Sequence, residues 1–309
     1  MAENPTTVAD EQGHVTPPIL DGVPPVLDEA HIGDIRGALG TIRMGDTGAR
    51  HDWRSRVMAL LAIMGPGLIV MVGDNDAGGV STYAQAGQNY GTTLLWTLIF
   101  LIPVLIVNQE MVIRLGAVTG VGHARLINER FGRFWGWFSV GDLFVLNFLT
   151  IVTEFIGVSL ALGYFGISKY IAVPLAAAAL VGITSTGSFR SWERFMYMFV
   201  IANFLVIPLL FLVHAHTGTI AHDVFLPGIR GGGSSTAVLL IIAIVGTTVA
   251  PWQLFFQQSN IIDKRITPRW INYERLDTWI GAFVVVIGAA ALIAVSAFAF
   301  QGHPRYFGH

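Results

Sequence analysis

Seven stretches of this chain are apolar over the length of a membrane-spanning helix, and they constrain the fold more than any other feature. A helix needs about 20 apolar residues to cross a hydrocarbon core of about 30 Å. The composition agrees, because 53% of the residues are hydrophobic, 12% are charged and the mean hydropathy is +0.61. We therefore expect an all-α, multi-pass membrane protein. The predicted spans are 57–88, 93–115, 137–165, 170–186, 195–214, 236–262 and 278–300.

The first and sixth spans are interrupted by residues that disfavour a continuous helix. Residues 73–79 read GDNDAGG, and residues 246–252 read GTTVAPW. Carboxylates in an apolar span cost roughly 2.5–3.5 kcal/mol each on insertion scales, and glycine allows the backbone to unwind. Pro251 removes a backbone donor and frees a carbonyl about one turn earlier, near Thr247. Two broken helices in one membrane protein indicate the substrate site of a transporter.

The aspartates of the first break, Asp74 and Asp76, allow two interpretations. Hard divalent cations prefer carboxylate and carbonyl oxygens, and Mg²⁺ keeps several waters while using one or two carboxylates. The same aspartates could instead cap a re-entrant turn by accepting hydrogen bonds from free backbone amides. The residues of this segment alone leave both interpretations open.

The chain divides into a predicted disordered tail, residues 1–50, and a transmembrane domain, residues 51–309. The tail is acidic and rich in proline and glycine, without the basic start of a signal peptide. Zero cysteines exclude thiolate metal sites, the net charge of −2 does not indicate a nucleic-acid partner, and we find no nucleophile–base pair typical of an enzyme. Most of the 18 Lys and Arg residues fall on the tail's side of the membrane, which predicts a cytoplasmic N-terminus in the plasma membrane. The exceptions are Lys169, Arg230 and Arg305.

Three segments of the chain resemble the Nramp family of divalent-metal transporters. Residues 65–96, GPGLIVMVGDNDAGGVSTYAQAGQNYGTTLLW, resemble the family's first helix, and residues 246–259, GTTVAPWQLFFQQS, resemble its sixth. Residues 114–132, RLGAVTGVGHARLINERFG, resemble its connection between helices two and three. The resemblance covers about residues 57–300. It implies a transported metal ion as substrate, no cofactor, and a LeuT-type fold of two inverted repeats.

Only the first repeat and helices six and seven of such a fold are present in this sequence. We therefore expect either a truncated product or a separate C-terminal half that completes the protein in the bilayer.

The resemblance also implies a metal site that departs from the usual family pattern. The family's asparagine and methionine ligands are replaced by Gly79 and Ala250. Loss of the thioether removes the soft ligand that favours Mn²⁺ or Fe²⁺, and smaller residues leave room for an ion that keeps its waters. This pattern resembles the Nramp-related magnesium transporters, so we expect Mg²⁺ with Mn²⁺ as substrate. The predicted metal-site residues are Asp74, Asp76, Gly79, Thr247, Ala250 and Trp252.

A second departure concerns proton coupling. The family's proton route uses a histidine on helix six and an acidic pair on helix three, where this chain has Trp252, Ile151 and Glu154. Tryptophan and isoleucine do not titrate, so the resemblance implies uptake that is not coupled to protons. Glu154 is the remaining coupling candidate. Its simpler interpretation is a lone buried carboxyl that forms a hydrogen bond to a neighbouring helix.

Three other functions remain open. A proton-coupled Mn²⁺/Fe²⁺ importer would need the sulfur, histidine and second acid that are missing. An amino-acid transporter of the same fold would place a carboxylate beside Asp76, which would repel it. A non-transporting membrane protein, such as a sensor or a partial gene product, is favoured by the missing helices and opposed by Asp76.

Overall fold

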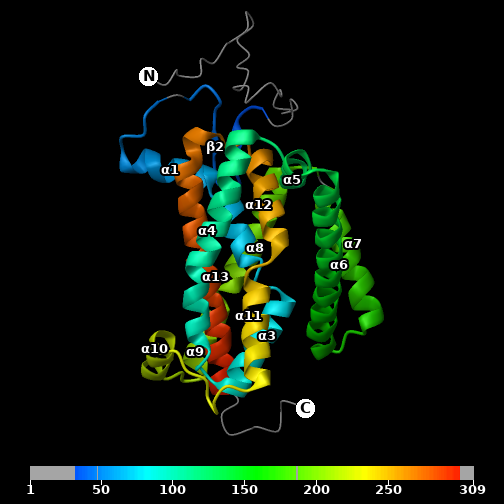
Figure 1. Cartoon of the computed structure of the whole chain (residues 1–309), viewed down its shortest axis with the longest axis vertical. Helices are drawn as coiled ribbons and strands as arrows, with labels where there is room; N and C mark the ends of the chain where they lie inside the picture. The colour runs from blue at the N-terminus through cyan, green and yellow to red at the C-terminus, as the bar shows by residue number, and fades with distance from the viewer. Residues whose placement is uncertain (1–31, 47, 186, 300–309) are drawn as a thin grey trace, which may run out of the picture.

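The computed structural model describes residues 32–46, 48–185 and 187–299, and within these ranges the chain is helical apart from one short hairpin (Figure 1). The hairpin pairs two antiparallel strands, with Ile35 opposite Ile42. The elements in chain order are β1 (Ile35–Arg36), β2 (Thr41–Ile42), α1 (Trp53–Ile63), α2 (Pro66–Val72), α3 (Ala77–Tyr90), α4 (Leu95–Thr119), α5 (His123–Phe131), α6 (Arg133–Tyr164), α7 (Lys169–Thr184), α8 (Phe189–Asn203), α9 (Val206–Leu212), α10 (Thr217–Phe225), α11 (Ser235–Thr248), α12 (Pro251–Asp263), η2 (Pro268–Trp270) and α13 (Ile271–Ala299).

Among the described residues, five helices are long and apolar enough to cross a membrane. This confirms five of the predicted spans, while the predicted span at 170–186 is the shorter apolar helix α7. The first predicted span differs more, because α1 and α2 meet at 54°. Gly65 has φ 148°, which only glycine adopts readily, and Pro66 starts a new helix. The five helices are Leu95–Thr119, Arg133–Tyr164, Phe189–Leu212, Ser235–Asp263 and Pro268–Ala299.

Part of the predicted disordered tail is folded. Residues 1–31 lie outside the described part of the chain, but residues 32–46 form the β1–β2 hairpin. Ile35 and Ile42 are 4% and 5% exposed, so the hairpin buries apolar side chains that a solvated tail would leave in water. Two isoleucines in a polar, glycine-rich sequence were too weak a signal to predict this.

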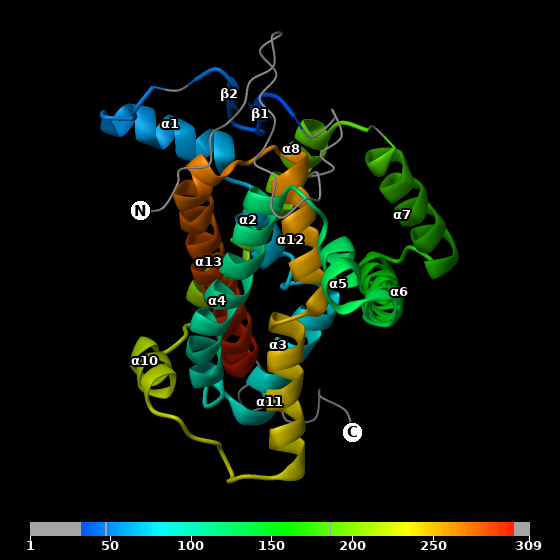
Figure 2. The same cartoon turned by 45° about the horizontal axis from the view of Figure 1, so that its top comes forward.

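Helix α13 is the most buried of the five long helices and packs against α2, α3 and α4 (Figures 1 and 2). The contact with α3 is close enough that a Cβ at Gly87 would overlap the carbonyl oxygen of Ile293. The core between these helices is formed by aliphatic and aromatic side chains, including Met71, Tyr83, Leu98, Leu105, Val285 and Ile293. This packing holds α2, α3 and α12 in fixed positions around the two breaks.

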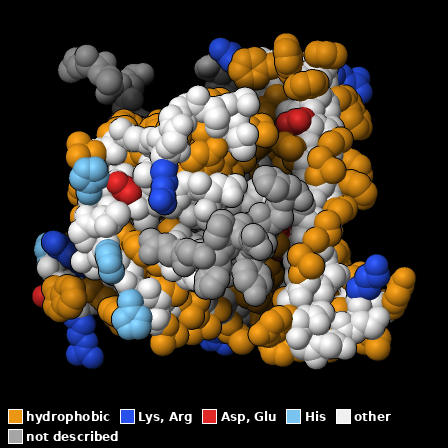
Figure 3. Space-filling view, turned by 90° about the horizontal axis from the view of Figure 1, so that it is seen from below, with side chains coloured by type: hydrophobic (Ala, Val, Ile, Leu, Met, Phe, Trp, Pro, Cys, Tyr) orange, Lys and Arg blue, Asp and Glu red, His pale blue; other side chains and the backbone are white. Residues whose placement is uncertain are grey.

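Helices α6 and α7 stand to one side of the bundle in both views (Figures 1 and 2). Within α6 the single buried residue is Gly136, and large side chains such as Phe144 and Leu160 are exposed. Seen from below, hydrophobic side chains line much of one side of the molecule (Figure 3). In a membrane protein such faces suit contact with lipid or with further helices.

Candidate metal site at two helix breaks

The first break has the residues that an interrupted helix requires. Helix α2 ends at Val72, and α3 begins at Ala77 with Asp76 as its N-cap. The Asp76 Oδ1 atom accepts a hydrogen bond from the Gly79 N–H at 2.7 Å, which satisfies one free amide of the first turn. A Cβ at Gly79 would overlap the carbonyl oxygen of Asp74. The turn therefore requires glycine at position 79.

The second break follows from Pro251. Helix α11 ends at Thr248, and α12 starts with Pro251 at its first position, where a missing N–H does no harm. The Ala250 N–H donates to the Gln253 Oε1 atom at 3.1 Å, so a side chain of α12 caps its own start. Both predicted breaks are thus present within the described residues.

A cavity of about 250 Å³ lies between the two breaks and α6. Four of the predicted site residues line it: Asp76, Thr247, Ala250 and Trp252. Gly79 is adjacent, through its N–H bond to Asp76. The remaining lining residues are Gly78, Leu146, Leu149, Thr150, Thr153, Gly246 and Pro251.

Two lining residues, Thr150 and Thr153, are not among the site residues predicted from the sequence. They sit three positions apart on α6, so both threonines lie on the face of this helix that lines the cavity. The Thr153 hydroxyl donates to the Thr150 carbonyl at 2.7 Å, which leaves its oxygen free to accept. The i, i+3 spacing could have identified them, but polar residues at this spacing are common on membrane helices.

Asp74 does not line this cavity, although it was predicted as a metal-site residue. Its side chain is buried, and Oδ1 accepts a hydrogen bond from Gln253 Nε2. The other oxygen, Oδ2, has no hydrogen-bond partner among the described residues. Gln253 therefore joins the two breaks, because its Oε1 atom accepts from Ala250 and its Nε2 atom donates to Asp74. A second link is the 2.8 Å bond between the hydroxyls of Tyr83 and Thr248.

Glu154 of α6 contacts the start of α3. Its Oε1 atom accepts a hydrogen bond from the Ala77 N–H at 3.1 Å, which is the helix-to-helix bond of the simpler interpretation. Ile151, at the position of the second acid, is 53% exposed on the same helix. Within the described ranges, no group of three or more His, Cys, Asp or Glu side chains is placed to hold a metal ion. The cavity thus offers one carboxylate, a backbone break and hydroxyls.

Two broken helices that meet at an acidic cavity define a class of helical membrane transport proteins. Residues 67–306 match the family model described as Natural resistance-associated macrophage protein-like, or Nramp. The chain belongs to the Nramp family. Its members are metal transporters and not enzymes, and they use no cofactor because the metal is the transported substrate.

Known relatives agree with this assignment. The divalent metal cation transporter MntH of Mesorhizobium japonicum is 30% identical over 292 residues, which are 89% of this chain and 62% of that protein. MntH of Erwinia tasmaniensis is 27% identical, with 81% and 62% coverage. The crystal structure of the Eremococcus coleocola manganese transporter shares the fold, with a TM-score of 0.68, 22% identity, and coverage of 82% of this chain and 56% of that one. The chain thus spans about three fifths of the length of these curated relatives.

Proposed function

We propose that this chain forms the ion-binding part of a divalent-metal transporter in the plasma membrane, with its N-terminus in the cytoplasm. The observation that carries the proposal is the shared cavity, where Asp76 of the first break faces Thr247 and Ala250 of the second. A carboxylate between two helix ends provides a hard anionic ligand, and the unwound backbone adds carbonyl oxygens. The test is cation binding by the purified chain, with Asp76 replaced as described in the Discussion.

We further propose Mg²⁺, with Mn²⁺, as the cargo. Ala250 and Gly79 bring no sulfur and no amide, so the cavity has no side chain that prefers soft metals. The cavity volume of about 250 Å³ is many times the space that a single water needs, so several waters fit beside Asp76. That is enough for a hydrated ion held through its water shell by Asp76 and the hydroxyls of α6.

The proposed transporter includes helices beyond this chain. The proposed architecture is a LeuT-type pair of inverted repeats, with the first repeat and helices six and seven supplied by α1 to α13. Two observations support a further C-terminal half: the chain covers 62% of MntH from M. japonicum, and α6 and α7 leave apolar faces uncovered within the described structure.

Metal entry is expected to leave the internal pH unchanged. Trp252 and Ile151 cannot carry protons, and Glu154 is hydrogen-bonded to the Ala77 N–H. The flux should still respond to voltage, because a divalent ion gains about 4.6 kcal/mol per 100 mV. The measurement uses a pH-sensitive dye inside proteoliposomes that contain this chain together with the C-terminal helices. Acidification in step with metal influx would favour the second candidate, a proton-coupled manganese importer.

Asp74 is expected to position the second break rather than to bind the ion. Replacing Asp74 with asparagine keeps an oxygen that accepts from Gln253, so cation affinity should change by less than about threefold. Replacing it with alanine leaves Gln253 Nε2 without this partner and should destabilise the protein by about 1–3 kcal/mol. Isothermal titration and thermal unfolding measure the two effects. Loss of binding in Asp74→Asn would instead make Asp74 a ligand.

A further inference from the structure

The β1–β2 hairpin covers one end of the helix bundle and precedes the residues that match the family model (Figure 1). Its two isoleucines, Ile35 and Ile42, belong to one buried cluster with side chains from α1, α4, α12 and the connection to α13. The other members of the cluster are Ala59, Ala62, Ile63, Ile113, Ala117, Ile261, Ile266 and Trp270. The hairpin therefore packs against the ends of several helices at once, and we call this contact surface its seat.

The turn of the hairpin fits closely against α1. A Cβ at Gly37 would overlap the carbonyl oxygen of Ala62, and a Cβ at Gly40 would lie 2.9 Å from the Ala62 Cβ. Only glycine at both positions allows the two backbones to approach this closely. The surface of α1 at Ala62 is therefore complementary in shape to this turn.

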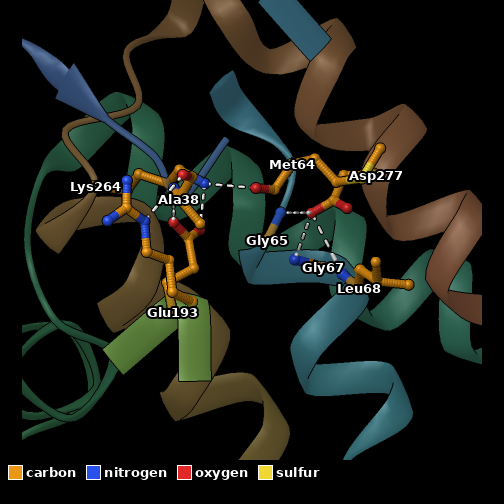
Figure 4. Close-up of polar contacts among 9 residues, drawn as sticks. Ala38, Met64, Gly65, Gly67, Leu68, Glu193, Lys264 and Asp277 are labelled. Atoms are coloured by element: carbon orange, nitrogen blue, oxygen red, sulfur yellow. Dashed lines mark hydrogen bonds and ion pairs between the residues drawn. The ribbon is translucent and has the colours of Figure 1, made fainter. Parts of the chain in front are cut away.

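The tip of the turn reaches a buried ion pair (Figure 4). The Ala38 N–H donates to the Glu193 Oε2 atom, while Glu193 Oε1 pairs with Lys264 Nζ. Both charged side chains are 0% exposed, although they come from α8 and from the end of α12. Lys264 Nζ also donates to the Met64 carbonyl at 2.7 Å. The hairpin therefore supplies a hydrogen bond to an ion pair that joins α8, α12 and the α1–α2 junction.

Arginines hold the backbone of the hairpin and the residues that follow it. Arg194 of α8 donates to the Ala38 carbonyl at 3.3 Å, and Arg265 donates to the Asp34 carbonyl at 3.4 Å. Arg269 donates to the Gly48 carbonyl at 2.9 Å. These bonds tie the segment to the same end of the bundle at three points.

The neighbouring start of α2 is held in the same region. Asp277 of α13 accepts hydrogen bonds from the N–H groups of Gly65, Gly67 and Leu68, at 3.0, 2.8 and 3.3 Å (Figure 4). The start of α2 is thus bound to α13 through Asp277, and the end of α12 is bound to α8 through the pair of Lys264 and Glu193. Helices α2 and α12 are each one half of a broken helix, and both of these contacts lie beneath the hairpin.

We propose that residues 32–46 form a strap that holds this end of the two broken helices together, and that the strap must leave its seat before α2 and α12 separate. A buried ion pair is stable only while its hydrogen bonds are satisfied. When the hairpin leaves, water reaches Glu193 and Lys264, and their attraction weakens in the higher dielectric. The proposal concerns the movement of α2 and α12 and does not rest on the proposed cation transport.

Cysteine labelling can test the strap, because the sequence contains no cysteine and introduced thiols have no background. Ile42→Cys reports on the seat of the hairpin, and Ile69→Cys, on α2, reports on the separation of the broken helices; both positions are at most 7% exposed. Ala38→Pro removes the N–H that donates to Glu193, whereas the matched control Ala38→Gly keeps it. Maleimide labelling rates are compared in lipid nanodiscs without added metal.

We expect Ala38→Pro to label about tenfold faster than Ala38→Gly at both reporters, as loss of one hydrogen bond to a charged group predicts. Faster labelling at position 42 with an unchanged rate at position 69 would overturn the strap, since the hairpin would then be only a cover. Unchanged rates at both positions would also overturn it.

A second variant protects the test against misfolding. Ile35→Ser removes an apolar contact of the seat instead of the hydrogen bond and should accelerate both reporters as well. Leu98→Cys, at a core position that is 0% exposed, should stay unlabelled in every background and shows that the bundle is folded. If Ala38→Pro exposes position 98, Ile35→Ser decides the outcome. Because no cation is used, failure here leaves the proposed transport function standing.

Discussion

Replacing Asp76 with asparagine is expected to abolish binding of Mg²⁺ and Mn²⁺ to this chain. Among the described residues that line the cavity, Asp76 is the single carboxylate. Loss of a residue that only hydrogen-bonds a metal ligand typically lowers metal affinity by about 10–100-fold. Loss of the charged ligand itself should lower the affinity of a hard cation by more than about 100-fold. Isothermal titration with both ions measures the change.

Asparagine is the sharper variant because Asp76 also caps α3. Its Oδ1 atom accepts from Gly79, and an asparagine oxygen can do the same. Asp76→Ala removes both the charge and the cap, with a cost in stability of about 1 kcal/mol. Equal loss of binding in the two variants, with destabilisation in alanine alone, would separate the two roles. Parental affinity in Asp76→Asn would exclude Asp76 as the ligand.

Replacing Ala250 with methionine should shift selectivity toward soft metals. Ala250 lines the cavity at the N-cap of α12, so a thioether there would face an ion beside Asp76. We expect Cd²⁺ and Mn²⁺ to gain about tenfold in affinity relative to Mg²⁺, since sulfur prefers softer ions. Competition titrations measure the ratio. Ala250→Leu fills a similar volume without sulfur, and an equal shift in that control would attribute the effect to cavity size.

Restoring the family's asparagine at position 79 is a poorer test of selectivity. A side chain there would overlap the Asp74 carbonyl, so Gly79→Asn should distort the first turn of α3 instead of adding a ligand. The two departures from the family pattern are therefore not equivalent in this structure. Ala250 can be changed alone, whereas Gly79 is part of the backbone geometry that places Asp76.

The helix breaks could be predicted from sequence because their causes are local. Pro251 and the glycines around Asp76 act on the backbone within one turn, whatever the rest of the fold does. The different surroundings of Asp74 and Asp76 could not be predicted. In a non-helical segment, the side chains of residues two positions apart can face different sides. The hydrogen-bond partner of Asp74 is Gln253, which lies 179 positions away in the sequence, so no local pattern indicates it. The place where the hairpin packs depends on Glu193 and Lys264, and both residues are far from the hairpin in sequence.

The position of Gln253 makes the two breaks mechanically dependent on each other. One end of its amide holds the Ala250 N–H of the second break, and the other end holds Asp74 of the first. Moving the first break away from the second would break the bond between Gln253 Nε2 and Asp74, whereas the bond between Gln253 Oε1 and the Ala250 N–H lies within the start of α12 and can stay intact. Packed elements of this kind switch between discrete arrangements instead of deforming gradually. We therefore expect the first break and the start of α12 to separate in a single step, when the bond from Gln253 to Asp74 is lost, and not by gradual displacement.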